Sequence, residues 1–411
     1  MSKVYINSIK QISTQQPLVD DWFEQPVFYS EPYVRALEPD YKQFFTPNES
    51  RRLGKILKRA LLVSRQTMSE SGVASPDAII TGTGLGCIEN TEIFLNKLVR
   101  EGEEMLNPTH FMQSTHNTIS SLIAIDAKNY GYNITYAHKG VSFESALQDA
   151  FMQIMHKRDA MNHGDAMNRV STVLVGAHDE MTPDYFTLLK KAGYLGKPNQ
   201  IFAGETAVAM MLSAEKSEKT LCAIEAVEKL YCDVRCATMR YEIGDKLQSH
   251  VSRLNISRPD YVLIGANGDP ENDDVYFENC AKLFPGVPLL QYKNVFGESY
   301  TAPALGVYAA AVCLQKGEIP DFLRCDRDAI CDMRYAICDA PSQAPPKGGV
   351  CDVRDEMCDV RYAMCDRRDE TQESLKSQVP SLKSQIANRK SKILCYNHFE
   401  GKNHTFILLT S

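Results

Sequence analysis

The chain has 411 residues, of which 44% are hydrophobic and 24% are charged. This length suits two domains or one large duplicated domain, and the composition is that of an ordinary globular protein. A formal net charge of −7 argues against general binding to nucleic acids or anionic membranes, because both are polyanions.

Short apolar strands alternate with amphipathic helices along most of the chain. Strands are expected at 3–9, 78–81, 133–137, 173–175, 207–212, 220–223, 259–265, 392–396 and 405–409. Helical periodicity is expected at 51–69, 89–100, 120–130, 143–150 and 301–315, whereas 20–49 is aromatic and irregular and is interpreted as a covering loop. This alternation predicts a layered α/β fold.

The ends of the chain and its cysteines bear on the compartment. The N-terminus has no apolar signal core. Thirteen cysteines, an odd number without secretory context, predict free thiols in a reducing, cytoplasmic compartment. The longest apolar run, 302–314, contains Pro303 and falls short of the ~20 residues of a membrane span, so no integral membrane segment is expected.

One segment departs from the α/β plan. Between Cys325 and Asp369 a seven-residue unit beginning Cys-Asp recurs, at residues 331, 351, 358 and 365. Prolines and glycines interrupt it, and it lacks both the apolar seam of a coiled coil and the close cysteine pairs of a zinc site. We interpret about 324–391 as a repeat-derived, disordered surface insertion. A trace of the unit at Cys232 predicts a second exposed, poorly ordered place.

Residues 131–151 predict a strand, a tight turn and a buried helix in succession. The strand ends at a Lys139-Gly140 corner. Ser142 is a good N-cap for the following helix, and Glu144 places a negative charge in its first turn, where it suits the helix dipole. Many α/β enzymes hold a nucleophile at such a corner, but here the apex is glycine.

Other motifs are weak when taken singly. Cys87 replaces the third glycine of a dinucleotide-binding loop that would begin at Gly82, so no nicotinamide cofactor is expected. Cys87 is interpreted as a small buried thiol, although a nearby histidine could make it a nucleophile. His398 and His404 lack a third ligand and are interpreted as structural or surface side chains, so no metal is expected.

Taken in order, these segments resemble the β-ketoacyl-acyl-carrier-protein synthases, condensing enzymes of the thiolase superfamily. The resemblance covers about 1–320 and 392–411. It is carried by the glycine-rich loop 82–86, Asn107-Pro-Thr-His-Phe111 with Asn117, Gly204-Glu205-Thr206-Ala207, 259–273, Lys293-Asn-Val-Phe-Gly297 and Asn397-His-Phe-Glu-Gly-Lys-Asn403. It implies a thiolase-like five-layer αβαβα fold with two pseudo-symmetric halves, at about 1–215 and 216–411, the second interrupted by the insertion.

That family condenses acyl groups with a cysteine at a helix start and two histidines. The positions of this chain that match them are Gly140, Asn267 and Glu298, and only the family's lysine is retained, as Lys293. Glycine cannot accept an acyl group, and a carboxylate repels a developing enolate. Glu144 would also raise the pKa of any thiol at the turn. Standard Cys-His-His condensation is therefore not expected.

Among such enzymes the chain is similar to a chain-length factor, especially of aryl-polyene and flexirubin-type pathways. This resemblance implies a non-catalytic subunit of polyketide or fatty-acyl biosynthesis that forms a heterodimer with a catalytic ketosynthase and meets an acyl carrier protein. Residues 20–45 and 110–130 are the expected interface and tunnel lining, or else ordinary core. The alternatives are a divergent 3-oxoacyl synthase or acyltransferase using Ser142, His138 or Cys87, and a decayed gene product.

Overall fold

A computed structural model describes residues 3–104, 106–161, 170–232, 246–249, 251, 258–325 and 391–411. Its strands are β1 Val4–Ile12, β2 Ala78–Gly82, β3 Tyr132–Tyr136, β4 Thr172–Asp179, β5 Thr206–Ser213, β6 Cys222–Tyr231, β7 Tyr261–Ile264, β8 Leu289–Gln291, β9 Lys392–Phe399 and β10 Asn403–Thr410. Its helices are α1 Pro47–Arg52, α2 Lys55–Ser71, α3 Ile88–Glu101, α4 Pro108–Ser114, α5 Thr118–Asp126, α6 Ser142–Met161, α7 Pro183–Lys191, α9 Pro270–Leu283, α10 Lys293–Phe296 and α11 Pro303–Lys316.

The described strands form one sheet whose two halves repeat each other. Its strand order is β3-β2-β4-β5-β1-β6-β10-β9-β7-β8, so β1–β5 and β6–β10 follow the same order outward from the centre. In each half three strands run parallel and the inner two pair antiparallel. The halves join where β1 pairs with β6 through Val4–Ile6. The expected α/β fold with two pseudo-symmetric halves is confirmed.

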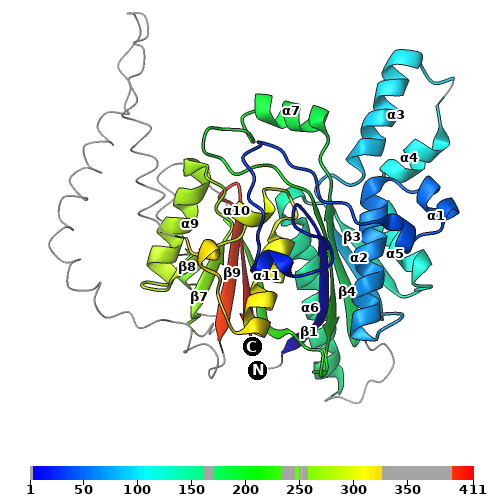
Figure 1. Cartoon of the computed structure of the whole chain (residues 1–411). Helices are drawn as coiled ribbons and strands as arrows, with labels where there is room; N and C mark the ends of the chain where they lie inside the picture. The colour runs from blue at the N-terminus through cyan, green and yellow to red at the C-terminus, as the bar shows by residue number, and fades with distance from the viewer. Residues whose placement is uncertain are drawn as a thin grey trace, which may run out of the picture. The chain divides into compact units, whose positions relative to one another are not determined.

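Two helices lie between elements of both halves. α6 packs on β2, β3 and β4 and also contacts β6, whereas α11 packs on β7, β9 and β10 and also contacts β1 and β5. The two helices touch each other. All residues of α11 from Pro303 to Leu314 are buried. The helix is apolar on every face, as expected of a helix that is enclosed on every side. In Figure 1, α2 and α5 flank the half formed by β1–β5, and α9 flanks β7 and β8.

The aromatic stretch at 20–49 covers the core, as its composition predicts. It forms two short 3₁₀ helices, Asp21–Phe23 and Tyr41–Gln43, followed by α1. Trp22 is buried, and its Nε1 donates a hydrogen bond of 2.9 Å to the hydroxyl of Tyr308 on α11. This bond ties the loop to the central helix layer.

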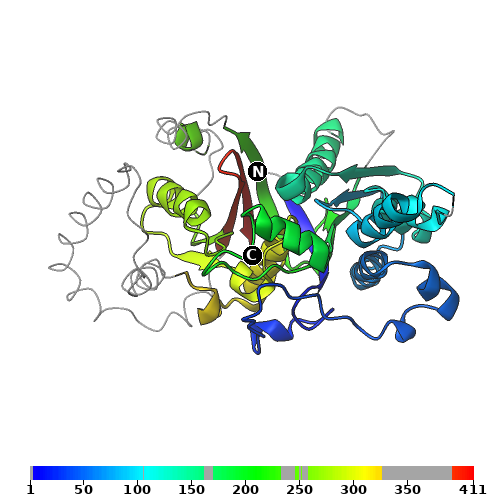
Figure 2. The same cartoon turned by 90° about the horizontal axis from the view of Figure 1, so that it is seen from above.

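Several elements are longer than the sequence predicts or are not predicted by it. β6 is much longer than the predicted 220–223 strand, and α4, α7, α9 and β8 were not predicted. α7 has no buried residue, and acidic and amide side chains obscure the apolar stripe of α9. Figure 2 shows α7 (green) between α9 and the α3–α5 region (cyan).

The predicted insertion at 324–391 lies outside the described residues, apart from Arg324, Cys325 and Ser391 at its borders. The prediction that the repeat trace at Cys232 is exposed is wrong for that residue, which is 4% exposed and whose N–H bonds to Lys402 O. Within the part of the chain that is described, no helix is long and apolar enough to cross a membrane.

Candidate active-site cavity

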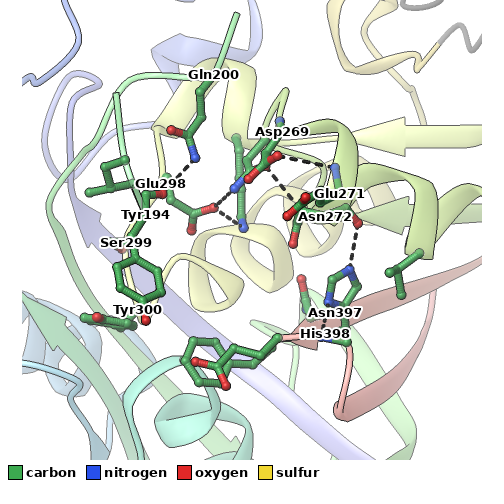
Figure 3. A pocket seen from close by; sticks show the side chains of 18 of the residues that line it. Tyr194, Gln200, Asp269, Glu271, Asn272, Glu298, Ser299, Tyr300, Asn397 and His398 are labelled. Atoms are coloured by element: carbon green, nitrogen blue, oxygen red, sulfur yellow. Dashed lines mark hydrogen bonds and ion pairs between the residues drawn. The ribbon is translucent and has the colours of Figure 1, made fainter. Parts of the chain in front are cut away.

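A cavity of about 690 Å³ opens beyond the carboxyl ends of β7, β8 and β9 (Figure 3). This is where parallel strands of α/β folds usually present their ligand-binding loops. Four segments supply its polar wall: the turn before α6, the β7–α9 corner, the α10 segment and the β9–β10 turn. Tyr185 and Leu189 of α7, with Tyr194 and Tyr300, add an aromatic and apolar side.

Three of the positions singled out in the sequence meet in this cavity. Glu298 Oε2 accepts a hydrogen bond of 2.7 Å from Lys293 Nζ and one of 2.8 Å from Asn267 Nδ2. Lys293 and Asn267 are buried, and the Glu298 side chain is 17% exposed. The Glu298 carboxylate thus has both a charge partner and a hydrogen-bond donor within the protein. These interactions are strong, because electrostatic attraction inside a protein is screened less than in water.

The β7–α9 corner fixes the orientation of Asn267. The buried carboxylate of Asp273 accepts hydrogen bonds from Asn267 N at 2.9 Å and Gly268 N at 3.0 Å. Asn267 Oδ1 accepts from Asp269 N and Asn272 Nδ2. With its oxygen doubly bonded, the amide of Asn267 directs its NH₂ group at Glu298.

The backbone of Glu298 is also held by hydrogen bonds. Its N–H donates to Phe202 O at 2.9 Å, and its carbonyl accepts from Gly204 N at 2.8 Å. Gly297 precedes it with φ of +81°, and a Cβ there would lie 2.5 Å from the Phe202 ring. The turn therefore requires glycine at 297 and aims residue 298 into the cavity.

Gly140 also lies on the cavity wall, within the 3₁₀ turn Lys139–Val141 that precedes α6. A Cβ added at Gly140 would lie 2.3 Å from Cδ2 of Phe399, closer than real Cβ contacts come. The Phe399 ring thus occupies the space in which a side chain at 140 would begin.

Two histidines, His398 partly buried and His404 buried, hold the turn that carries Phe399. Nε2 of His398 donates to Asn272 O at 3.0 Å, and its Nδ1 accepts from Gly401 N at 3.3 Å. Nε2 of His404 donates to Gly401 O at 3.1 Å, and its Nδ1 accepts from the Tyr396 hydroxyl. Burial lowers the pKa of His398 to about 3 and that of His404 to about 4, so both are neutral at pH 7. Their spacing around a Gly401 turn was the only sequence signal for this role.

The fallback nucleophiles named in the sequence do not line the cavity. Ser142 is buried, and its hydroxyl accepts from His138 N and donates to Lys139 O, both at 2.7 Å. Ser142 is therefore the first residue of α6 and a brace for the turn, not the expected N-cap. Cys87 is fully buried, and burial followed by the Glu180 charge raises its pKa above the ordinary value. His138 is exposed, with its ring beside Tyr136.

Glu144 differs from the sequence prediction in its charge. Burial raises the pKa of Glu144 to about 8, and the opposing effects of Lys229 and Lys293 are smaller. The carboxyl is therefore mostly protonated at pH 7, and the expected negative charge in the first turn of α6 is largely absent. The expected effect of its charge on a thiol at the turn stays a prediction, since residue 140 is glycine. Among the described side chains, no group of three or more histidine, cysteine or carboxylate residues is arranged to hold a metal ion.

A family model described as the N-terminal domain of β-ketoacyl synthases matches residues 31–252. No curated protein matches the chain. Solved structures match it along its whole length at low identity. One is the ishigamide ketosynthase/chain length factor, with 15% identity, a TM-score of 0.66, and coverage of 100% of this chain and 99% of that chain. A β-ketoacyl synthase from Burkholderia phymatum has 12% identity, a TM-score of 0.67 and the same coverage. A ketosynthase in complex with its chain length factor from Xenorhabdus doucetiae has 14% identity, a TM-score of 0.62, and coverage of 100% and 98%. At these identities the matches show a shared thiolase fold.

Proposed function

The chain belongs to the β-ketoacyl synthase family, and we propose that it acts there as a non-catalytic, chain-length-factor-like subunit in polyketide or fatty-acyl biosynthesis of the aryl-polyene type. The observation that carries the proposal is the cavity wall at Gly140. No side chain at that position can accept an acyl group, and the Phe399 ring fills the space in which one would begin.

The charges opposite Gly140 support the same proposal. Condensation builds negative charge on a carbonyl oxygen, which needs hydrogen-bond donors aimed at it. Asn267 and Lys293 are donors, but both are engaged by Glu298 Oε2. Glu298 is a carboxylate in the cavity wall, and it disfavours an enolate formed beside it, because like charges repel in a partly buried cavity. The engagement of these two donors by Glu298 therefore supports a subunit that does not condense acyl groups.

An uncovered face beside β3 supports a partner subunit. β3 is an end strand of the sheet, and within the described residues only β2 pairs with it. α5 packs against β3, and α4 against α5. Large apolar side chains are exposed on and around these elements: Phe111 at 57%, Met112 at 68%, Ile125 at 75%, Tyr130 at 97% and Tyr132 at 39%. An open strand edge beside exposed apolar groups is typical of a protein interface.

We propose that a catalytic ketosynthase covers this face in a heterodimer, so that 110–130 contributes to the interface. Two of the matching solved structures pair a ketosynthase with a chain length factor. An acyl carrier protein is the proposed second partner, the cytoplasm the proposed compartment, and the loop between β5 and β6 the proposed boundary between the halves. The stretch at 20–45 remains a proposed contributor to the tunnel.

Acyl transfer to the protein tests the non-catalytic role. The purified chain is incubated with octanoyl-loaded acyl carrier protein, and its intact mass is measured beside that of a ketosynthase with an intact cysteine. No octanoyl adduct is expected on this chain, and a full adduct on the control. A stoichiometric adduct on this chain would overturn the proposal.

Co-purification tests the partnership. The chain is co-expressed with a ketosynthase encoded beside it, and the complex is sized by light scattering. Phe111→Asp and Ile125→Asp should separate the subunits without unfolding the chain, because both side chains are exposed. Leu188→Asp is the matched control, since Leu188 is 60% exposed on α7, away from β3. A heterodimer that survives both substitutions at the β3 face would contradict this interface.

A further inference from the structure

We propose that the outer face of α7 and the turn that follows it dock an acidic protein, which under the proposed function is the acyl carrier protein that brings acyl thioesters to the cavity. The identity of this partner rests on the proposed function. The place and the charge of the docking surface come from the side chains of residues 185–204.

The outer face of α7 is uncovered in the part of the chain that the structure describes. None of the residues of this helix is buried. Tyr185 and Leu189 line the cavity from its inner face, whereas Leu188 is 60% exposed. Tyr194, in the turn after the helix, is 63% exposed and also lines the cavity. Exposed apolar side chains thus extend from the outer face of α7 to the cavity wall, as at a site of protein interaction.

The same stretch is basic, although the chain is acidic. Residues 185–204 contain three lysines and no aspartate or glutamate, whereas the whole chain has a formal net charge of −7. Lys197 pairs with Asp269, but Lys190 and Lys191 are exposed and neither has a carboxylate partner among the described residues. The dipole of α7 favours lysines in its last turn, but it does not account for the lack of acids in the ten residues beyond. Two unpaired ammonium groups beside exposed apolar side chains favour a partner that presents carboxylates.

The turn after α7 positions one of these lysines. A Cβ at Gly196 would lie 3.1 Å from Cδ and 3.2 Å from Cγ of Lys190, and Gly196 has φ of +69°. Glycine therefore suits this turn in both its backbone conformation and its contact with the stem of Lys190. The stem lies against the turn while the ammonium group stays in water. A side chain that is already held in this way loses less conformational entropy when it binds.

The two sides of the cavity differ in charge. Glu271 and Glu278 of α9 line the cavity and are exposed, opposite in sign to the lysines of α7. An acidic protein is therefore attracted to the α7 side and repelled from the α9 side, which fixes its orientation at the cavity. In Figures 1 and 2, α7 lies apart from α4 and α5, so the proposed heterodimer interface does not include it.

Binding of a carrier protein tests the surface on the full chain. The probe is fluorescently labelled, octanoyl-loaded acyl carrier protein, and fluorescence anisotropy measures its affinity at several salt concentrations. Lys190→Glu with Lys191→Glu should weaken binding about tenfold, because each reversal replaces an attraction with a repulsion. The loss should shrink as the salt concentration rises, since salt screens exposed charges. Arg51→Glu with Arg52→Glu is the matched control, because both arginines are exposed on α1 and the net charge changes equally.

A second variant tests the apolar part of the surface. Leu188→Ser should weaken binding severalfold without changing its salt dependence, because it removes apolar area and no charge. Leu95→Ser is the matched control, since Leu95 is 49% exposed on α3. Thermal melts verify that each variant folds, and light scattering sizes the chain alone. A homodimer that Leu188→Ser dissociates would assign this face to a second copy of the chain and overturn the inference.

The outcomes separate this inference from the proposed function. No binding of the carrier protein, or an affinity that none of the α7 variants changes, would overturn the docking surface. Equal losses from the α7 and α1 charge reversals would also overturn it, because they would show an effect of net charge alone. None of these results alters the adduct and heterodimer experiments, so the docking surface and the non-catalytic role fail separately.

Discussion

Restoring a side chain at residue 140 tests the most specific feature of the cavity. A Cβ at Gly140 would lie 2.3, 2.8 and 2.9 Å from three atoms of the Phe399 ring. Gly140→Cys must therefore displace that ring, and overpacking of this kind typically costs about 1–3 kcal/mol. The backbone adds no strain, because Gly140 does not have a positive φ. We expect Gly140→Cys to lower the free energy of unfolding by about that amount.

Removing the obstructing ring supplies the control. Gly140→Cys with Phe399→Ala should recover most of the lost stability, and Phe399→Ala alone completes a double-mutant cycle that isolates the contact. Urea unfolding measures the four free energies, and iodoacetamide labelling measures access to the new thiol. Neither cysteine variant should condense acyl groups, because Asn267 and Glu298 remain. A single variant as stable as the original chain, with no coupling in the cycle, would refute the clash.

Three further predictions concern stability. Glu144 has a pKa of about 8 in the folded state, against an ordinary value of 4.5. Between these pH values the folded state binds a proton that the unfolded state has lost, so Glu144 lowers the free energy of unfolding as the pH rises. Glu144→Gln should thus stabilise the chain progressively from pH 5 to pH 8, by about 2–4 kcal/mol at the upper end, in urea unfolding at several pH values; a gain independent of pH would contradict this. Glu205→Gln should cost about 3–5 kcal/mol, because it strips the buried Arg59 of a carboxylate 3.0 Å away. Glu38→Gln removes the partly exposed partner of the same arginine and should cost less, and equal losses would count against burial as the cause. Trp22→Phe should cost about 1–2 kcal/mol through the lost bond to Tyr308, and a cycle with Tyr308→Phe that shows no coupling would argue against it.

Local patterns predicted most of the sheet because its strands are short apolar runs. They failed where an element has no apolar signature of its own: α7 buries no residue, and β8 is three residues long. β6 was underestimated because its outer part alternates with half-exposed charges such as Glu228 and Lys229. Such an element is stabilised by its neighbours in the sheet, and these lie far away in the sequence.

The candidate site was likewise predicted in part from the sequence. The resemblance assigned Gly140, Asn267, Glu298 and Lys293 to one site, and the structure brings all four to one cavity. The sequence could not show the ionisation of Glu144, which depends on burial by segments far from it in the chain. Nor could it show that Ser142 braces its own turn, since that depends on the rotamer and the turn geometry.

The sequence by itself determined which chemical groups stand at each position, and so the absence of a thiol at 140 and of imidazoles at 267 and 298. Composition and periodicity also sufficed for the alternation of strands and helices, because those signals are local. Only the tertiary structure decided that the Phe399 ring fills the space beside Gly140 and that Lys293 and Asn267 donate hydrogen bonds to Glu298. These relations join segments distant in the chain, and they arise only when the two halves pack around α6 and α11.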